Sequence, residues 1–553
     1  MFTAKKYPTP AKVSLDDRQW PNQRIEAAPM WCSVDLRDGN QALVDPMTVE
    51  QKMRLFLLLV DMGFKHIEVG FPAASQPDFD FVRRLIEEQK IPEDVVIQVL
   101  VQCRESLIER TFEALKGAKK AIVHIYNSTS VVQREQVFKL DKQAIKAIAV
   151  EGAVFVKSMA EKAPETEWSF QYSPESFTGT EVEYAVEVCN AVIDVWQPSK
   201  NRPCIINLPA TVEMTSPNVY ADQIEYFCRH VKSRDAIIVS LHTHNDRGCG
   251  VAAAELGLMA GADRLEGTLL GNGERTGNMD IVTAAMNLYS QGIEPELDLS
   301  QMDHIIATVE ACTAIKTHPR HPYAGELVFT AFSGSHQDAI NKCLSTRSPD
   351  EVWQVAYLPI DPADIGRDYQ AVIRINSQSG KGGVAFLLEQ QYGLQLPRWM
   401  QIDFSGCVQR LSEELAKELS SDQIWQAFCD AYLAPTPLKL EALKLEHTVE
   451  GESVCVTIDH VGQKVQGRGD KAGSLEILIN VLQDALALPI KILEYQEHAV
   501  TAGAESNAVA YVLLSIHGQR YAGAGLASDI LGAVFSAALS ATNNYMTREQ
   551  LAA

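Results

Sequence analysis

Short apolar segments alternate with amphipathic ones through the first 300 residues. Eight segments rich in β-branched and aromatic residues are predicted to be strands: 31–36, 65–70, 95–102, 121–126, 168–173, 204–209, 236–242 and 264–269. Between them apolar residues recur at helical spacing, as in 49–62, 105–117, 142–162 and 217–232. This alternation predicts an α/β fold with a parallel sheet and helices outside it. Eight such units in about 260 residues favour a closed (β/α)8 TIM barrel over an open doubly wound sheet.

The pattern changes after the barrel. Residues 292–425 have helical periodicity with long polar connections, and the proline-rich segment 433–437 indicates a boundary. Beyond it, GQKVQGRGD (462–470) recurs as GQRYAGAG (518–525), and each copy precedes an amphipathic helix. This duplication predicts two β-β-β-α units in a C-terminal α+β domain. The predicted organisation is an N-terminal extension (1–30), a barrel (31–303), helical linker subdomains (304–436) and a C-terminal domain (437–553).

The composition limits the kinds of molecule that this protein is expected to bind. A chain of 553 residues needs two or three domains. The net charge of -22 argues against nucleic acid and anionic membranes, because both attract basic surfaces. Neither an apolar run of about 18 residues nor a signal-peptide core is present. Eleven cysteines without a C-x-x-C pair are typical of reduced thiols. We therefore expect an acidic cytoplasmic protein that does not bind membranes.

Polar residues gather where the predicted strands end, which is where TIM barrels carry their active sites. They include Arg37 and Asp38 after the first strand, His124 and Tyr126 on the fourth, Ser173 and Glu175 on the fifth, Thr211 after the sixth, His242 and His244 on the seventh, and Glu274 and Asn278 after the eighth. Scattered surface polarity would not collect at equivalent places. The pattern predicts one functional site.

Three of these residues suggest a metal centre. His242 and His244 lie two apart on a strand, so both side chains point to the same face. An isolated H-x-H is more often a pair of hydrogen-bonded core histidines, but Asp38 adds a third ligand and leaves positions open for substrate. Asn278 could orient or complete this set. The donors suit Mg²⁺, Mn²⁺ or Zn²⁺ and also describe non-haem iron oxygenases, which remain a rival.

Several longer segments resemble the 2-isopropylmalate synthase family, in its longer bacterial and fungal form. They are APMWCSVDLRDGNQALVDPM (28–47), SLHTHNDRG (240–248), EGTLLGNGERTGN (266–278), PYAGELVFTAFSGSHQDAI (322–340) and LPIDPADIGRDYQAVIRINSQSGKGG (358–383). The DLRDG and H-x-H elements are shared with homocitrate and citramalate synthases, so they identify only the superfamily. The segments over 322–383 and the C-terminal region favour 2-isopropylmalate synthase within it.

The resemblance implies a metal-dependent Claisen condensation of acetyl-CoA with 3-methyl-2-oxobutanoate. Thioester hydrolysis then gives 2-isopropylmalate and CoA, in the first committed step of leucine biosynthesis. A divalent ion, first Mg²⁺ and otherwise Mn²⁺ or Zn²⁺, would be held by Asp38, His242, His244 and Asn278. It would act as a Lewis acid on the keto group. The resemblance also implies a homodimer.

The same resemblance suggests roles for the other residues. Arg37 would assist at the developing alkoxide. The remaining expected roles are Thr211 for the substrate carboxylate, His124, Tyr126 and Ser173 for the wall around the branched side chain, Glu175 and Glu274 as available carboxylates, and His336 and Tyr369 as groups supplied to the neighbouring chain's site. We predict that His336 and Glu175 take part in proton transfer, in an order left open.

The C-terminal region resembles an allosteric domain that binds leucine as a feedback inhibitor. A helix N-terminus near Gly469 could accept the amino acid's carboxylate, and Asp470 or Asp529 could meet its ammonium group. The first repeat departs from the family pattern, since Asp470-Lys471-Ala472 stands where Asn-Gly-Pro is expected. A dimerisation domain without a ligand is the alternative.

Other functions are also compatible with the sequence. Citramalate or homocitrate synthase would use the same chemistry on another keto acid. No extra Arg or Lys follows the fourth to sixth strands, which argues against 2-oxoglutarate as substrate. An iron oxygenase and a non-catalytic leucine sensor are rivals of different classes.

Overall fold

Eight parallel strands close into a barrel in chain order, as predicted. The computed structural model describes residues 4–7, 12–331, 333–348, 350–367, 381–415, 419–448, 451–470, 473–500 and 507–552. The barrel strands are β1 (Met30–Ser33), β2 (His66–Gly70), β3 (Val96–Gln102), β4 (Lys120–Ser128), β5 (Glu167–Glu175), β6 (Cys204–Ala210), β7 (Ile237–Thr243) and β8 (Arg264–Gly267). The ring closes where β8 pairs with β1.

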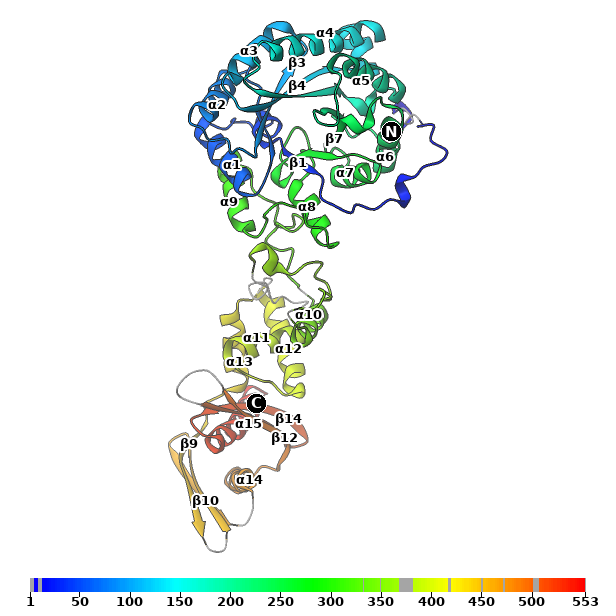
Figure 1. The fold of residues 1–553 in the computed structure, drawn as a ribbon. Coiled ribbons are helices and arrows are strands. Elements are labelled where there is room, and N and C mark those ends of the chain that lie inside the picture. Colours follow the sequence, from blue (N-terminus) through cyan, green and yellow to red (C-terminus); the bar gives the residue numbers. More distant parts are fainter. Residues whose placement is uncertain are drawn as a thin grey trace. The chain divides into compact units, whose positions relative to one another are not determined.

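Helices surround the barrel (Figure 1). They are α1 (Val49–Asp61), α2 (Gln76–Glu87), α3 (Glu105–Leu115), α4 (Lys142–Glu161), α5 (Val182–Trp196), α6 (Pro217–His230), α7 (Gly250–Met259) and α8 (Ile281–Tyr289), followed by α9 (Met302–Thr313), which packs on α1. Their starts use ordinary capping chemistry. Thr48 and Gln51 form a capping box on α1, and the Asp141 side chain caps α4.

The first strand is shorter than predicted. It ends at Ser33, and Asp35–Gly39 forms a π-helical turn that carries Arg37 and Asp38. The Asp35 carboxylate accepts hydrogen bonds from the Ser33 hydroxyl at 2.8 Å and from the Leu269 amide at 3.0 Å. These bonds hold the chain against the residues that follow β8, so it turns instead of extending.

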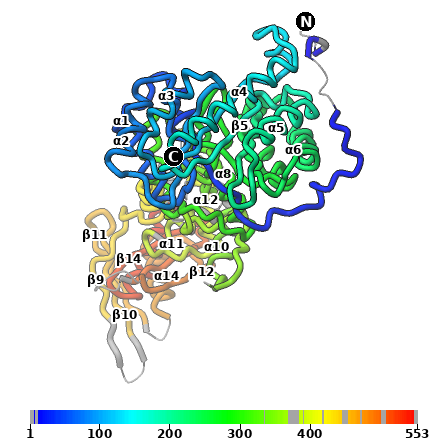
Figure 2. The backbone as a smooth tube through the Cα atoms, turned by 45° about the horizontal axis from the view of Figure 1, so that its top comes forward, coloured from blue at the N-terminus to red at the C-terminus, as the bar shows by residue number. Residues whose placement is uncertain are grey.

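The segment before β1 is fixed to the outside of the barrel along α6 (Figure 2). Arg18 donates to both carboxylate oxygens of Asp222 at 2.6 and 2.7 Å. Glu225 accepts from the backbone amides of Gln19 and Trp20. Charge-assisted, bidentate bonds of this kind fix a segment in a defined place.

The chain falls into two compact units. The first comprises Met1–Val328 and Ile360–Arg367, and the second comprises Phe329–Pro359 and Asp368–Ala553. In the second unit lie α10 (Gly334–Thr346), α11 (Lys381–Tyr392), α12 (Arg398–Leu415) and α13 (Ser421–Tyr432). The predicted domain boundaries at 303/304 and 436/437 stay a prediction.

The predicted duplication is present in the second unit. The first repeat contains β9 (Leu438–Thr448), β10 (Gly451–His460), β11 (Gln463–Asp470) and α14 (Ser474–Leu486); the second contains β12 (Ile490–Val500), β13 (Asn507–Ile516), β14 (Gln519–Ala527) and α15 (Ile530–Ala552). Each repeat is a three-stranded antiparallel sheet followed by a helix. Their apolar faces share one core.

Glycines on β14 let α15 approach closely. A Cβ on Gly525 would lie 2.1 Å from the Ala533 carbonyl oxygen, closer than atoms tolerate. We expect Gly525→Ala to destabilise this repeat by about 1–3 kcal/mol through overpacking. Amide hydrogen exchange in β14 and α15 should accelerate by about 5–150-fold, since 1.4 kcal/mol is tenfold. Gly406→Ala in α12, whose nearest neighbouring atom lies 3.6 Å away, should leave that exchange unchanged.

The eleven cysteines are free thiols. Among the described helices, none combines the length and apolar character needed to span a bilayer.

Candidate active site

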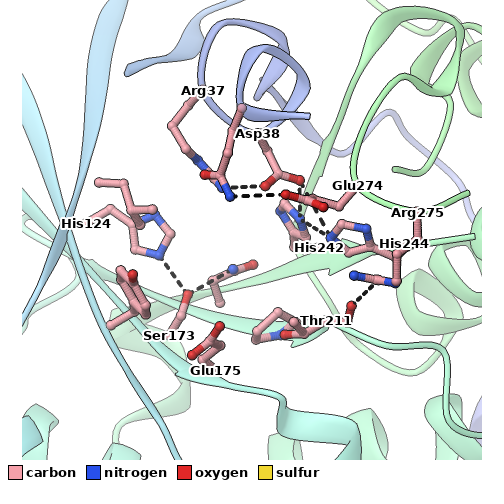
Figure 3. A pocket seen from close by; sticks show the side chains of 15 residues that line it. Arg37, Asp38, His124, Ser173, Glu175, Thr211, His242, His244, Glu274 and Arg275 are labelled. Atoms are coloured by element: carbon pink, nitrogen blue, oxygen red, sulfur yellow. Dashed lines mark hydrogen bonds and ion pairs between the residues drawn. The ribbon is translucent and has the colours of Figure 1, made fainter. Parts of the chain in front are cut away.

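A pocket of about 270 Å³ opens at the carboxyl ends of the barrel strands. Its lining residues are Arg37, Asp38, Gln41, Leu100, His124, Tyr126, Ser173, Glu175, Asn207, Pro209, Thr211, His242, His244, Glu274 and Arg275 (Figure 3). Most of the barrel residues selected from the sequence thus meet in one cavity. They come from strands and loops all around the ring, as strand-end positions of a closed barrel must.

Asp38, His242 and His244 form a compact, buried ligand cluster. Asp38 Oδ2 lies 3.5 Å from His242 Nε2 and 3.6 Å from His244 Nε2, and the two Nε2 atoms are 3.3 Å apart. Neighbouring ligand atoms that each bind one ion at about 2.1 Å lie about 3.0–3.4 Å apart. The observed separations are close to this spacing, so the three donors fit one divalent ion.

Unpartnered polar atoms support the same fit. Asp38 Oδ2 and Asn278 Oδ1 are buried without a hydrogen-bond partner among the described residues. Asn278 forms an isolated β-bridge with His244, which brings its amide beside the cluster. A buried acceptor left unpaired costs about 1–3 kcal/mol, and a bound cation removes that cost.

The cluster has an uneven distribution of charge. Burial would raise the pKa of Asp38, but Arg37 and then His242 hold it well below its usual range. Burial lowers the pKa of His242, yet the nearby carboxylates of Asp38 and Glu266 outweigh it and raise the value to about 9. Burial and the neighbouring His242 charge lower the pKa of His244 to about 4. Without an ion, His242 is therefore a positively charged imidazolium at neutral pH, with a proton on each ring nitrogen.

Metal affinity should depend on pH for this reason. An ion must displace the proton from His242, whose pKa is about 9. Below that pH, apparent Co²⁺ affinity should rise about tenfold per pH unit, because one proton leaves for each ion bound; above it, the affinity should level off. Spectroscopic Co²⁺ titrations from pH 6 to 9 test this. Affinity that does not change over this range would contradict the assigned protonation state.

Arg37 lies directly beside the cluster. Its Nη1 is 2.5 Å from Asp38 Oδ1, and its Nε donates to Glu68 Oε1. Burial would lower the pKa of Arg37, but Glu68 and Asp38 outweigh this and keep the guanidinium charged. A fixed cation in a buried site can stabilise negative charge that develops on a substrate oxygen.

One wall of the pocket is a continuous hydrogen-bonded chain. Glu68 Oε2 lies 2.7 Å from His124 Nδ1, and His124 Nε2 lies 2.7 Å from Ser173 Oγ. Asn207 Nδ2 donates to Ser173 Oγ at 3.0 Å. With the His124 proton on Nδ1 toward Glu68, the Ser173 hydroxyl donates to His124 and accepts from Asn207. The side chains of this wall therefore hold one another in place through hydrogen bonds.

The other polar residues are also held in place. Glu175 accepts from the Ser128 hydroxyl, and Glu274 accepts from Gln41 at 3.4 Å. Thr211 Oγ1 accepts from the Ser176 amide at 2.9 Å. Arg275 donates to the Thr211 carbonyl oxygen and, at 2.6 Å, to Asp246. This ties the loops after β6, β7 and β8 together.

Comparison with known proteins identifies the family. The HMGL-like family matches residues 28–309, the family described as alpha-isopropylmalate synthase, post-catalytic domain-like matches 326–389, and the LeuA allosteric (dimerisation) domain matches 418–546. The 2-isopropylmalate synthase of Pseudomonas fluorescens (strain Pf0-1) is 54% identical over 99% of this chain and 98% of its own length. The chain belongs to the 2-isopropylmalate synthase family.

Other 2-isopropylmalate synthases also match over most of their length. The relative from Alcanivorax borkumensis is 54% identical over 100% of this chain and 99% of its own. That from Corynebacterium glutamicum (strain R) is 53% identical over 96% and 89%. Among solved structures, hydroxymethylglutaryl-CoA lyase from Pseudomonas aeruginosa has 18% identity and a TM-score of 0.44, over 54% of this chain and 96% of its own. As a member of the 2-isopropylmalate synthase family the protein is an enzyme of the transferase class.

Some residues that the 2-isopropylmalate synthase resemblance suggested lie elsewhere. His336 is near the start of α10 in the second unit, where its ring stacks on Tyr357 at 3.9 Å between centroids. Tyr369 lies outside the described residues. Their expected roles stay predictions.

The suggested regulatory residues are on the second unit's repeats. A Cβ on Gly469 in β11 would lie 2.7 Å from the Ile477 side chain, so this glycine permits close packing of α14. The Asp470 side chain lies outside what the structure describes. Asp529 is exposed and caps α15 by accepting from the Gly532 amide at 2.8 Å. Their roles in leucine binding stay predictions too.

Three buried polar residues in and around the pocket were not predicted from the sequence: Glu68, Asn207 and Glu266. Each lies within a barrel strand, β2, β6 or β8, between buried apolar neighbours or beside one, and is at most 1% exposed. A polar or charged residue inside a predicted buried strand was the available signal, because such groups are rarely buried without a partner.

Proposed function

We propose that the protein catalyses the 2-isopropylmalate synthase reaction. Acetyl-CoA condenses with 3-methyl-2-oxobutanoate, and hydrolysis of the thioester releases 2-isopropylmalate and CoA, at the entry to leucine biosynthesis. One observation carries the proposal: a buried Asp–His–His cluster with an adjacent charged arginine lines the barrel pocket of a chain that matches synthases over its whole length.

In this proposal Asp38, His242, His244 and Asn278 hold a divalent ion, with Mg²⁺ first and Mn²⁺ or Zn²⁺ as alternatives. When bound, such an ion polarises the keto group of the substrate. The Arg37 guanidinium faces the same oxygen and stabilises its developing charge. Thr211 Oγ1 already accepts from a backbone amide, so its own proton is available to the substrate carboxylate.

The acetyl methyl group must lose a proton before its carbon attacks the keto carbon. Glu175 is a carboxylate on the pocket wall and is our candidate to take part, with Glu274 as the second available carboxylate. Water then cleaves the thioester, the acyl carbon becoming a carboxylate and the CoA sulfur a thiol. His336 and Tyr369 are proposed to join these proton transfers from a second chain.

The pocket favours an apolar side chain on the keto acid. Its two arginines are both ion-paired, Arg37 with Asp38 and Glu68 and Arg275 with Asp246. Leu100 and Pro209 add apolar surface. Asn207 Oδ1, which has no partner among the described residues, is an acceptor and would repel a second carboxylate. Homocitrate synthesis is therefore disfavoured, because its keto acid carries a second carboxylate, and citramalate synthesis stays the alternative.

CoA thiol release tests the function. Protein supplied with acetyl-CoA and Mg²⁺ is given 3-methyl-2-oxobutanoate, pyruvate or 2-oxoglutarate, with a chelator-treated sample as the control. Preference for the branched acid supports the proposal. Preference for another acid would move the protein to a sister activity, and no release with any acid from metal-loaded folded protein would refute the enzyme assignment.

We also propose feedback inhibition by leucine at the first repeat. A groove of about 440 Å³ lies beside β11 and α14. Ile477 and Val481 offer it apolar surface, and Arg468 and Asp484 offer opposite charges. These are the groups that a branched amino acid needs for its side chain, carboxylate and ammonium. Calorimetric titration with leucine is the test, and absence of binding would remove this part of the proposal.

We further propose a homodimer in which each site takes His336 from the partner. Asp38→Asn and His336→Ala variants should each be inactive alone. Co-expressed in equal amounts, they should regain about a quarter of wild-type activity, since half of the dimers are mixed and each has one intact site. Mixed dimers that regain nothing would contradict shared sites.

A further inference from the structure

A buried carboxylate lies behind the metal cluster. Glu266 Oε2 is 3.0 Å from His242 Nδ1, on the side of the ring opposite the cluster. The equivalent atom of the other histidine, His244 Nδ1, is buried without a partner among the described residues. The two cluster histidines are therefore supported unequally.

Glu266 is itself held firmly. Its other oxygen, Oε1, accepts from Arg264 Nη1 at 2.6 Å and from Gln171 Nε2 at 2.7 Å. Arg264 is fully buried. Its remaining hydrogen bonds go to Ser240 Oγ at 2.9 Å, Gln171 Oε1 at 3.1 Å, Gln98 Oε1 at 2.9 Å and His66 Nδ1 at 3.1 Å. These partners come from β2, β3, β5 and β7, so most of the barrel wall anchors this ion pair.

Stability alone does not explain such a pair. Taking two charges out of water costs several kcal/mol each, and well-packed apolar residues of the same volume often do as well or better. Here the pair leaves one carboxylate oxygen directed at the ring of His242. That arrangement fixes the ring's rotation. In the neutral ring that binds an ion it also fixes the tautomer, with the proton on Nδ1 and the lone pair on Nε2 facing the cluster.

We propose that Glu266, anchored by Arg264, is a positioning residue that sets the metal affinity of His242. By accepting from Nδ1–H it makes Nε2 a stronger donor, and it commits His242 to the ion while His244 stays the less supported ligand. The inference rests on the proposed function, because it requires that the cluster hold a divalent ion.

Glu266→Gln is the test variant, since it keeps the shape and removes the charge. Co²⁺ titration of the full-length protein should show affinity lowered about 10–100-fold. The Co²⁺ absorption spectrum should also change, and the pH dependence of binding should shift. A merely structural role would move neither of these. The matched control is Asp78→Asn, which breaks a buried ion pair with Lys52 and touches no histidine. The Co²⁺ affinity of this variant should equal that of the wild type.

A second measurement needs no Glu266 variant. Wild-type protein should show a downfield imidazole N–H proton resonance from the His242 Nδ1–H bond, absent in His242→Gln. If that resonance is missing from wild type, or if folded Glu266→Gln binds Co²⁺ with unchanged affinity and spectrum, the inference is wrong and the proposed function stands. Wild-type protein that binds no divalent ion would instead refute the proposed metal-dependent function.

Discussion

Arg37→Gln should lower kcat by about 10²–10³-fold, equivalent to roughly 2.7–4 kcal/mol. The guanidinium is buried and charged beside the Asp38 carboxylate, so it needs no reorganisation when charge develops on the keto oxygen. Because this interaction strengthens only in the transition state, KM for the keto acid should change by no more than a few fold. Steady-state CoA release with saturating metal measures both constants.

Arg37→Lys should recover little of the loss. Arg37 uses Nη1 for Asp38 and Nε for Glu68, and a single ammonium group cannot reproduce that fork. Arg234→Gln is the matched control, because Arg234 is a partly buried, ion-paired arginine before β7, at the opposite end of the barrel. A loss below tenfold in Arg37→Gln would show that Arg37 does not stabilise the transition state.

Asp38→Asn should abolish activity, with a loss of at least about 10³-fold if metal polarisation contributes several kcal/mol. Asp38 is the anionic member of the cluster and lies 3.5 and 3.6 Å from the two histidine Nε2 atoms. A neutral amide at this position would leave two imidazoles to compete with protons for the ion. Metal content after dialysis and CoA release together measure the effect.

The two variants should differ in one respect. Asp38→Asn should lose bound metal, whereas Arg37→Gln should keep it, since Arg37 is not a ligand. Asp45→Asn, an exposed carboxylate shortly after the same turn, controls for loss of surface charge. If Asp38→Asn retained metal and activity, the cluster would have to be reassigned from a metal centre to a hydrogen-bonded core group.

The sequence determined the barrel and the main members of the site. Each strand and its following helix are adjacent in the chain, so their periodicity is a local property that can be read directly. Polar residues at strand ends then gather because parallel strands in a closed ring end at one face. Asp38, His242 and His244 could therefore be grouped before any coordinates. In the same way, the repeated GQ segments at 462 and 518 indicated two copies of one unit.

Tertiary structure alone decided which side chains support that site. Asp35 bonds an amide 234 positions away, and this contact ends β1 early and forms the turn that carries Arg37 and Asp38. In the sequence, Glu68 and Glu266 are simply residues in the middle of predicted strands. They become partners of His124 and His242 only because barrel closure and strand register bring β2 to β4 and β8 to β7 at matching heights.

In the second unit, too, the sequence predicted the elements and the tertiary structure decided how they pack. Repeat and periodicity predicted two sheets with helices, but not which sheet face the preceding helices cover. In the structure α11, α12 and α13 pack on the second sheet, against Val509, Tyr511 and Ala524. Packing between distant segments depends on the complementary shapes of surfaces that exist only after each element has folded, and a local sequence pattern does not encode it.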